Sequence, residues 1–194
     1  MKNLIIFAHP YSESYNSAIL KNIVDELKRR KQSVDVLDLY KEKFNPVLGE
    51  GELALYSEGQ YLDPKVKEYQ KRIDSADHLI FIFPVWWYDL PAILKGFLDK
   101  VLLKNWAYEL TKSGLPKGKL GFIKKTTVIS TMKSPNWYYR LLYKSSIKYS
   151  FIKGTLNFCG IKNVQWINIT NIENIGDQKR KKWLKKIRKW TSNN

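Results

Sequence analysis

Cysteine and histidine are scarce in this sequence. Its 194 residues include one cysteine, Cys159, and two histidines, His9 and His78. A single cysteine excludes an internal disulfide framework and is typical of a reducing compartment. Two histidines leave no basis for a Ser-His-Asp triad or a histidine-rich zinc site, so we predict no metal site. We expect Cys159 to be buried and inert, and His78, at the start of a strand, to be an exposed side chain.

Long apolar runs are also missing. No uninterrupted apolar stretch approaches the ~18 residues that a membrane-spanning helix needs. The first apolar run, residues 4–8, is too short to be the core of a signal peptide. We therefore expect a cytoplasmic protein.

Acidic residues are few relative to basic ones. The chain has 34 Lys and Arg against 18 Asp and Glu, a formal net charge of +16. Such an excess raises the question of nucleic acid or an anionic membrane. About half of it lies in residues 179–189, within a helix expected over 177–190. That helix carries Trp183, Leu184, Ile187 and Trp190 on one face, which favours packing on the body with a solvated basic face, and we do not expect a nucleic-acid partner.

Short apolar runs alternate with amphipathic helical patterns. This alternation predicts one α/β domain over residues 1–194, with a doubly wound parallel sheet and helices on both faces. The expected strands are 3–8, 33–39, 77–83, 124–131 and 164–170. The first expected helix begins at Asn16, and four others cover 63–76, 90–102, 139–159 and 177–190. Residues 40–62 are expected to form an irregular connection. In such folds ligands bind beyond the carboxyl ends of the strands, here the loops after Ala8, Phe83, Thr131 and Thr170.

The loop after the first strand, "FAHPYSESYNSA" (7–18), has no glycine and no lysine, so it matches neither familiar phosphate-loop pattern. It places polar side chains at a helix N-terminus, where free N–H groups favour an anion. These side chains are His9, Ser12, Ser14, Asn16 and Ser17. The alternative is a simple helix cap made by Ser14 or Asn16.

The loop after the third strand contains "FPVWWYDL" (83–90). Large aromatic side chains at the end of a buried strand are costly to leave in water unless something flat covers them. Trp86, Trp87 and Tyr88 are suited to stack on a ring system. A dimer interface or the edge of the core remains an alternative for these residues.

These two loops, together with "YQKRIDSADHLIFIFPVWWYDLPAILKGFLDKV" and "FCGI", resemble the flavodoxin-like NAD(P)H:quinone oxidoreductases. That group includes small bacterial quinone and azo reductases and the ancillary reductase subunits of potassium efflux systems. The resemblance implies a five-stranded sheet in the order 2-1-3-4-5, a bound flavin, NAD(P)H as electron donor, and a homodimer with the active site at the interface.

The resemblance also implies roles for particular residues. The flavin phosphate would be held by His9, Ser12, Ser14, Asn16 and Ser17. The flavin ring would lie beside Pro84, Val85, Trp86 and Trp87. After the fourth strand the family usually has Thr-Thr-Gly-Gly, and this chain has Ser130, Thr131, Met132 and Lys133. The active-site tyrosine would be Tyr138 or Tyr139, and the histidine that accompanies it is absent, since Lys144 lies near its position.

We therefore predict a flavin-dependent oxidoreductase that passes two electrons from NAD(P)H to quinones or similar small aromatic acceptors. FMN is favoured over FAD because the chain is short and the first loop is of phosphate size. The alternative is a flavin-binding ancillary subunit that docks on a membrane transport protein and has little turnover. The altered loop at Met132 and Lys133 and the basic final helix motivate that alternative.

Overall fold

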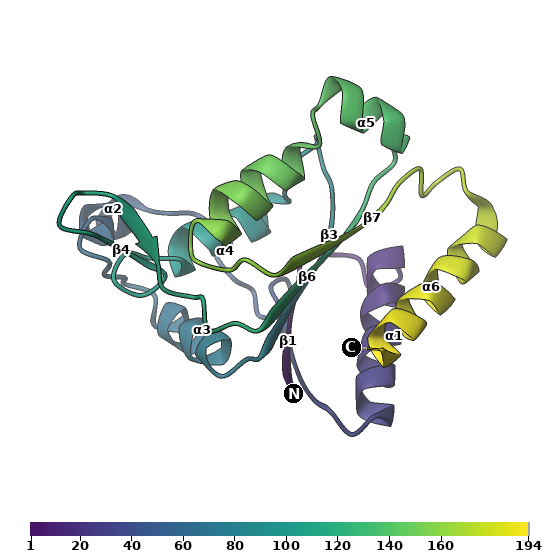
Figure 1. The fold of residues 1–194 in the computed structure, drawn as a ribbon, viewed down its shortest axis with the longest axis horizontal. Coiled ribbons are helices and arrows are strands. Elements are labelled where there is room, and N and C mark those ends of the chain that lie inside the picture. The colour runs from purple at the N-terminus through teal and green to yellow at the C-terminus, as the bar shows by residue number, and fades with distance from the viewer. Residues whose placement is uncertain (194) are drawn as a thin grey trace.

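A five-stranded parallel sheet forms the centre of the computed structural model, which describes residues 1–193. Its strands are β1 (Lys2–Phe7), β2 (Ser33–Asp38), β3 (His78–Pro84), β6 (Lys125–Thr131) and β7 (Val164–Ile169). They lie in the order β2-β1-β3-β6-β7, and every neighbouring pair is parallel (Figure 1). The order is the expected 2-1-3-4-5 once the two short strands outside this sheet are set aside, so the predicted fold class is confirmed.

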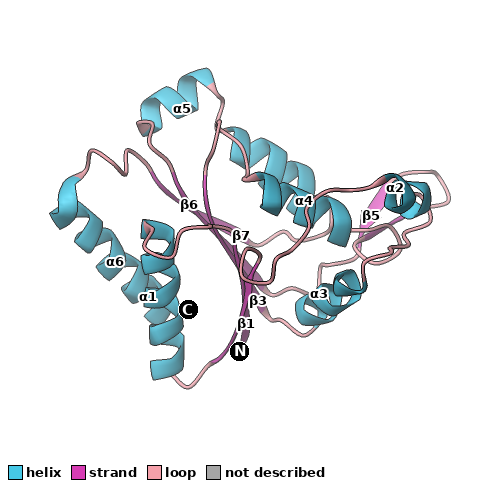
Figure 2. Cartoon of the chain, turned by 180° about the vertical axis from the view of Figure 1, so that it is seen from behind, coloured by secondary structure: helices cyan, strands magenta, loops and turns pink. Residues whose placement is uncertain are grey.

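Helices cover both faces of the sheet. The helices α1 (Tyr15–Arg29) and α6 (Gly176–Ser192) lie side by side on one face (Figures 1 and 2). The other face carries α3 (Pro64–Asp74), α4 (Ala92–Val101) and a π-helix, η1 (Lys148–Asn157). Two apolar cores result, one on each side of the sheet. β3 is buried along its whole length, as expected for a strand covered on both faces.

The connections between strands contain more structure than the sequence predicts. Residues 40–62 include the short helix α2 (Glu50–Tyr56), which corrects our expectation of an irregular connection throughout. The buried ammonium of Lys100 holds α2 in place. Its Nζ lies 3.0 Å from Glu52 Oε1 of that helix and 3.9 Å from Oδ2 of Asp63, the residue after the segment. Residues 103–123 include a small antiparallel hairpin of β4 (Tyr108–Leu110) and β5 (Pro116–Gly118).

Our prediction of a single helix over 139–159 is wrong. The chain forms α5 (Asn136–Leu142), turns, and starts again as η1. Lys144 and Ser145 at the turn have φ of 49° and 55°, the left-handed region that ends a helix. No glycine or proline marks this turn, and for that reason the helical spacing of apolar residues runs through it without a signal.

His78 is buried, which corrects our expectation of an exposed side chain. Its Nδ1 lies 3.2 Å from Asn3 Oδ1 and its Nε2 lies 2.9 Å from Thr127 Oγ1. It begins the central strand β3, and Trp190 of α6 covers the ring from outside the sheet. Burial, with Lys125 nearby, lowers the pKa of His78 to about 4, so the imidazole is neutral at pH 7.

Other expectations about the body of the protein are confirmed. Cys159 is buried, and burial raises the pKa of its thiol to about 11. The apolar face of α6 packs on the sheet, with Ile187 fully buried and Trp183 and Leu184 packed around it. Among residues 1–193, no helix has the length and apolar character to cross a membrane.

Candidate functional site

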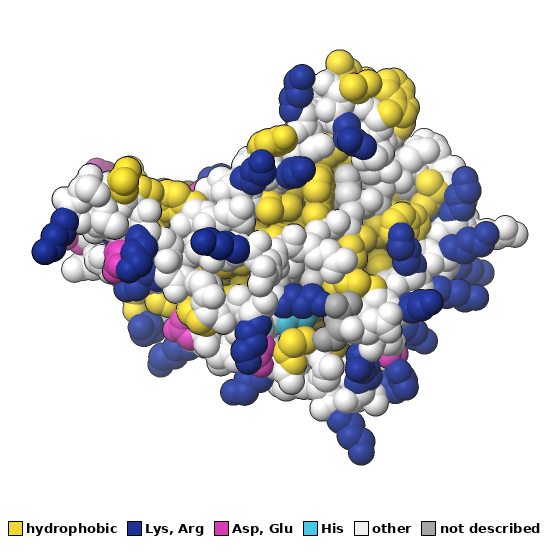
Figure 3. Space-filling model, in the orientation of Figure 1, with side chains coloured by type: hydrophobic (Ala, Val, Ile, Leu, Met, Phe, Trp, Pro, Cys, Tyr) yellow, Lys and Arg dark blue, Asp and Glu magenta, His cyan; other side chains and the backbone are white. Residues whose placement is uncertain are grey.

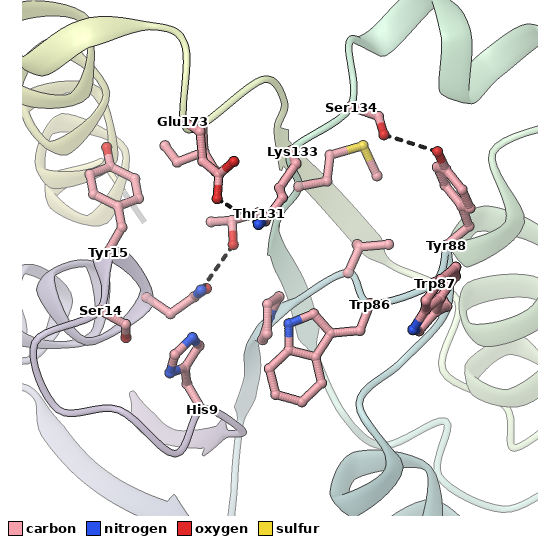
Figure 4. Close-up of a pocket in the computed structure, with 15 residues that line it drawn as sticks. His9, Ser14, Tyr15, Trp86, Trp87, Tyr88, Thr131, Lys133, Ser134 and Glu173 are labelled. Carbon is pink, nitrogen blue, oxygen red and sulfur yellow. Dashed lines mark hydrogen bonds and ion pairs between the residues drawn. The ribbon is translucent and has the colours of Figure 1, made fainter.

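A cavity of about 550 Å³ opens at the carboxyl edge of the sheet. The loops after β1, β3, β6 and β7 all contribute to it, which confirms the convergence expected for the four loops (Figure 4). The residues that line it are His9, Ser14, Tyr15, Asn16, Pro84, Val85, Trp86, Trp87, Tyr88, Thr131, Met132, Lys133, Ser134, Ile172 and Glu173. A volume of this size suits a small organic ligand.

One side of the cavity, which we call the polar wall, consists of His9, Ser14 and Asn16. Ser14 is the N-cap of α1, and its Oγ accepts a hydrogen bond from the N–H of Ser17 at 3.1 Å. The capping role considered for Ser14 is thus confirmed. The first N–H groups of a helix have no partner within it, so those of Tyr15 and Asn16 are available to an anion beside the polar wall.

His9 presents a neutral ring to the cavity. Its Nδ1 accepts a hydrogen bond from the N–H of Tyr11 at 3.1 Å, so the proton of the neutral ring is on Nε2. Burial lowers the pKa of His9 below its usual value, which keeps the ring uncharged at pH 7. His9 therefore offers a hydrogen-bond donor.

Asn16 connects the polar wall to the end of β6. Its side chain is buried, and Nδ2 donates to Thr131 Oγ1 at 2.9 Å. Its Oδ1 is also buried and has no hydrogen-bond partner. Buried polar groups are almost always paired, and an exception at a cavity points to a ligand that completes it.

The opposite side, which we call the aromatic wall, consists of Trp86, Trp87 and Tyr88. A tight turn from Trp86 to Asp89 forms it, closed by reciprocal backbone hydrogen bonds of 3.0 and 2.9 Å. Trp87 and Tyr88 have φ of 49° and 63°, a conformation that costs bulky residues about 1–3 kcal/mol each. Trp87 is 96% exposed. Strain and exposure in the same residue indicate a functional rather than a structural role for this turn.

The third side comes from the loops after β6 and β7. Lys133 Nζ lies 2.7 Å from Glu173 Oε1, so an ion pair joins these two loops at the edge of the cavity (Figure 4). Met132, the residue before Lys133, is buried. Ser134 Oγ lies 3.1 Å from the hydroxyl of Tyr88, which links the third side to the aromatic wall.

Ten of the predicted cofactor-binding residues line this cavity: His9, Ser14, Asn16, Pro84, Val85, Trp86, Trp87, Thr131, Met132 and Lys133. Ser12 and Ser17 line a second cavity, of about 580 Å³, on the other side of the first loop. Ser130 is buried in β6 and is not among the lining residues; its Oγ donates to Asn168 Oδ1 at 2.9 Å and accepts from Trp166 Nε1 at 2.9 Å.

The two candidate tyrosines have different environments. The hydroxyl of Tyr139 is buried, accepts from the N–H of Ile147 at 2.9 Å, and lies 3.1 Å from Ser146 Oγ. Tyr138 is partly exposed, and its ring centre lies 6.4 Å from that of Tyr88. Of the two, Tyr138 is the one whose side chain is accessible beside the aromatic wall.

The sequence assigned no role to four of the lining residues, Tyr15, Ser134, Ile172 and Glu173. Each lies in, or directly beside, one of the loops that the strand-end rule selected. The rule therefore located the segments, but an apolar residue such as Ile172 carries no chemical signal of its own. No group of three or more metal-ligating side chains within residues 1–193 is placed to hold a metal ion.

Comparison with known proteins adds to this geometry. The model of the flavodoxin-like fold family Flavodoxin_2 matches residues 1–191. An uncharacterized NAD(P)H oxidoreductase of Haemophilus influenzae is 34% identical over 182 residues, which cover 93% of this chain and 89% of that protein. This chain belongs to the flavodoxin-like NAD(P)H:quinone oxidoreductase family. It is accordingly an oxidoreductase enzyme.

Two further members of the family have informative names. The ribosyldihydronicotinamide dehydrogenase [quinone] of Pongo abelii is 32% identical over 183 residues, with 83% of this chain and 78% of that protein covered. The solved NAD(P)H:quinone oxidoreductase of Methanothermobacter marburgensis superposes with a TM-score of 0.88 at 27% identity. The superposition covers all of this chain and 98% of that chain. The first is similar to most of this chain, and the second to all of it.

The residues of the cavity fit a flavin. A phosphate needs N–H and O–H donors: the start of α1 and His9 offer N–H groups, and the Ser14 hydroxyl, 3.0 Å from Ser17 Oγ, would donate by turning from that contact. The hydroxyl groups of the chain that joins phosphate and ring would donate to the unpaired Asn16 Oδ1. A flat ring system finds exposed indoles at Trp86 and Trp87.

Proposed function

We propose that the cavity binds a flavin and that the protein passes two electrons from NAD(P)H to quinones or similar small aromatic acceptors. The flavin we propose is FMN, with FAD as the alternative. The observation that carries the proposal is the meeting of three features in one cavity. These are a helix N-terminus, a buried amide oxygen without a partner, and exposed aromatic rings. The names of the relatives quoted above support the reaction, and none of them supports the ancillary-subunit alternative.

The polar wall is proposed to hold the phosphate. Donation by Ser14, by His9 Nε2 and by the first N–H groups of α1 would satisfy its oxygens, and the positive end of the helix would stabilise its charge. This arrangement uses no lysine or glycine. Ser12 and Ser17, which face the second cavity, would then act through the shape of the loop.

The aromatic wall is proposed to position the ring. Trp86 would lie along it, with the backbone of Pro84 and Val85 available to its polar edge. The N–H of Val85 is already taken by the carbonyl of Thr131 at 2.7 Å, so carbonyl groups of this segment are the ones left for the ring. When bound, the flavin would take a hydride from NAD(P)H and supply the electrons for the acceptor.

Charge and hydrogen-bond donation complete the proposal. Lys133 is paired with Glu173 at the cavity edge, and its ammonium would stabilise negative charge on the reduced cofactor by turning from that carboxylate toward the ring. Tyr138 is proposed to donate a hydrogen bond to the oxygen of a quinone during reduction. Tyr139, with its hydroxyl engaged by Ile147, is proposed as a positioning residue that fixes α5 next to the aromatic wall.

We also propose a homodimer with the cavity near the interface. Trp87 is held out from the body on a strained turn, and an indole in that position is stabilised when a second chain covers it. Light scattering on the purified protein tests this, and a monomer at all concentrations would contradict it.

Mass spectrometry of the cofactor released by heating tests the binding proposal. We expect FMN in equimolar amount to the chain. Oxidation of NADH and NADPH with the water-soluble quinone menadione then tests the reaction. A protein that retains neither flavin would overturn the proposal, and a flavin-loaded protein without menadione-dependent NAD(P)H oxidation would overturn its catalytic part.

A further inference from the structure

The charge of the cavity differs from that of the surface around it. The chain has a formal net charge of +16, and basic side chains are spread over the face shown in Figure 3 with few acidic ones between them. Among the residues within 1–193 that line the cavity, however, only Lys133 and Glu173 carry a formal charge, because His9 is neutral. Their charges cancel, so the cavity of this strongly basic protein is itself uncharged.

The two loops that carry this pair are joined by their backbones. The N–H of Met132 donates to the carbonyl of Ile169 at 2.9 Å, and the N–H of Ile172 donates to the carbonyl of Met132 at 3.0 Å. A third hydrogen bond, of 3.1 Å, runs from the N–H of Asn171 to the carbonyl of Ser134. The loops therefore do not need the ion pair to stay together, and the pair can open without moving them.

The side chains of the pair are held much less firmly than the loops. Those of Lys133 and Glu173 are 77% and 58% exposed, and an ion pair of this kind contributes little to stability because water solvates both groups. The pair of Lys100 and Glu52 is the opposite case, with side chains 3% and 14% exposed. Figure 4 shows Lys133 and Glu173 pointing toward one another at the cavity, with the polar wall to the left and the aromatic wall to the right.

Opposite charges at one place in a redox site have opposite effects on the cofactor. Hydride uptake adds two electrons and one proton, so the reduced cofactor carries one more negative charge than the oxidised one. A nearby cation stabilises the reduced form, and a nearby carboxylate stabilises the oxidised form. Glu173 has a further effect, because it competes with the reduced cofactor for the ammonium of Lys133.

We propose that Glu173 sets the reduction potential of the flavin by restraining Lys133. The proposal rests on the proposed function, since it requires a bound flavin. With the flavin oxidised, Glu173 holds the ammonium and the cavity stays uncharged. With the flavin reduced, the ammonium divides between Glu173 and the ring, so the cavity prefers the reduced form less than Lys133 alone would make it. Glu173 is thus a positioning residue that lowers the potential and keeps the flavin a stronger reductant for its acceptor.

Two other roles fit the pair less well. A simple clamp between the loops would add little, because three backbone hydrogen bonds already join them. A phosphate held by Lys133 would lie beside the carboxylate of Glu173, which repels it, whereas the polar wall offers N–H donors without a carboxylate.

The midpoint potential of the flavin-loaded protein, titrated against an indicator dye, tests the proposal. Glu173→Gln should raise it by about 30 mV, which corresponds to a tenfold stronger preference for the reduced flavin in a two-electron couple. Lys133→Met should lower it by a similar amount, because Glu173 is then left without its cation. The double variant should lie between the two single variants, and all shifts should become smaller at high ionic strength.

The matched control is Lys124→Met. Lys124 and Lys133 flank the same strand, β6, and their side chains are 74% and 77% exposed. Each forms an ion pair of 2.7 Å, Lys124 with Asp77 and Lys133 with Glu173. Lys124 lies at the opposite edge of the sheet from the cavity. Its loss should leave the potential nearly unchanged, because salt screens the interaction over the length of the strand.

Unchanged potentials in both single variants, or shifts of the same sign, would overturn the proposal. A shift in Lys124→Met equal to that in Lys133→Met would also overturn it, because net charge alone would then explain the effect. Titration of the flavin-free proteins tests the phosphate role. We expect Lys133→Met to bind oxidised FMN and riboflavin about as the unchanged protein does. A loss of affinity for FMN but not for riboflavin would assign Lys133 to the phosphate and contradict the proposal.

These measurements separate this proposal from the proposed function, because a potential can be measured without turnover. A protein that binds flavin and shows the expected shifts but reduces no quinone supports this proposal and contradicts the catalytic part of the proposed function. A protein that binds flavin without the shifts contradicts this proposal alone. A protein that binds no flavin contradicts both.

Discussion

The two ends of the sheet each carry a histidine, an asparagine and a threonine, and the two trios differ in one respect. At the amino end, the closed trio of Asn3, His78 and Thr127 is buried, and both nitrogens of His78 have partners. At the carboxyl end, the open trio consists of His9, Asn16 and Thr131. There Asn16 bonds Thr131 but keeps a buried oxygen without a partner.

This difference distinguishes a trio that stabilises the fold from a trio that binds a ligand. Residue type does not distinguish the trios, since both offer the same functional groups. Satisfied hydrogen bonds make the closed trio part of the core, and the unsatisfied group, next to a cavity, marks the open trio as a site. Variants of one trio should therefore change stability, and variants of the other should change ligand affinity.

The largest effect is expected in the closed trio. His78→Leu leaves Asn3 Oδ1 and Thr127 Oγ1 without a partner in the core. The free energy of unfolding should fall by about 2–4 kcal/mol, measured by urea denaturation. Flavin affinity should stay within about twofold. A large loss of flavin binding in a folded His78 variant would contradict a purely structural role for the closed trio.

Between pH 6.5 and 4, the acid sensitivity of the fold should come mainly from the same residue. His78 has a pKa of about 4 when folded and about 6.5 when unfolded, so the unfolded chain takes up a proton between these values. Stability is complete above pH 6.5 and should fall by about 2–3 kcal/mol as the pH drops toward 4. Denaturation at several pH values measures this. His78→Leu should remove most of this dependence of the free energy of unfolding on pH, and an unchanged dependence would contradict the assignment to His78.

The matched change in the open trio is Asn16→Leu. It removes the hydrogen bond to Thr131 but also the unpaired oxygen, so the free energy of unfolding should change by less than about 1 kcal/mol. FMN affinity should fall about 10- to 100-fold, measured by quenching of flavin fluorescence. The opposite pattern, with lost stability and intact affinity, would make Asn16 a core residue like Asn3.

A smaller contrast of the same kind is expected within α5. Tyr139→Phe leaves the N–H of Ile147 unpaired and should lower the free energy of unfolding by about 1–2 kcal/mol, with a smaller loss of menadione turnover than Tyr138→Phe causes. Tyr138→Phe should leave stability unchanged and lower kcat about tenfold. Stopped-flow reduction of menadione by the reduced enzyme measures this step directly. If Tyr138→Phe has no effect on that step, its proposed role is wrong.

The sequence predicted the sheet because buried parallel strands are continuous apolar runs that alternate with helical patterns. It also predicted the four loops of the cavity, since their place follows from strand direction alone. The break at Lys144 and Ser145 escaped prediction because ordinary residues adopt the left-handed conformation there. His78 was misjudged because burial at a strand end depends on Trp190, which is distant in the sequence.

The same limit applies to the site. Periodicity and loop position identified Asn16 and Trp86, but the difference between Tyr138 and Tyr139 depends on a hydrogen bond to Ile147, eight residues away across an unpredicted turn. The unpaired oxygen of Asn16 is likewise a property of the folded chain, and no sequence pattern encodes it.

Titration of the flavin-free protein with FMN and with riboflavin tests whether the cavity holds a flavin by its phosphate. We predict that one FMN binds per chain, about tenfold or more tightly than riboflavin, because the polar wall and the start of α1 hold the phosphate. Binding of neither compound, or equal affinity for both, would contradict it.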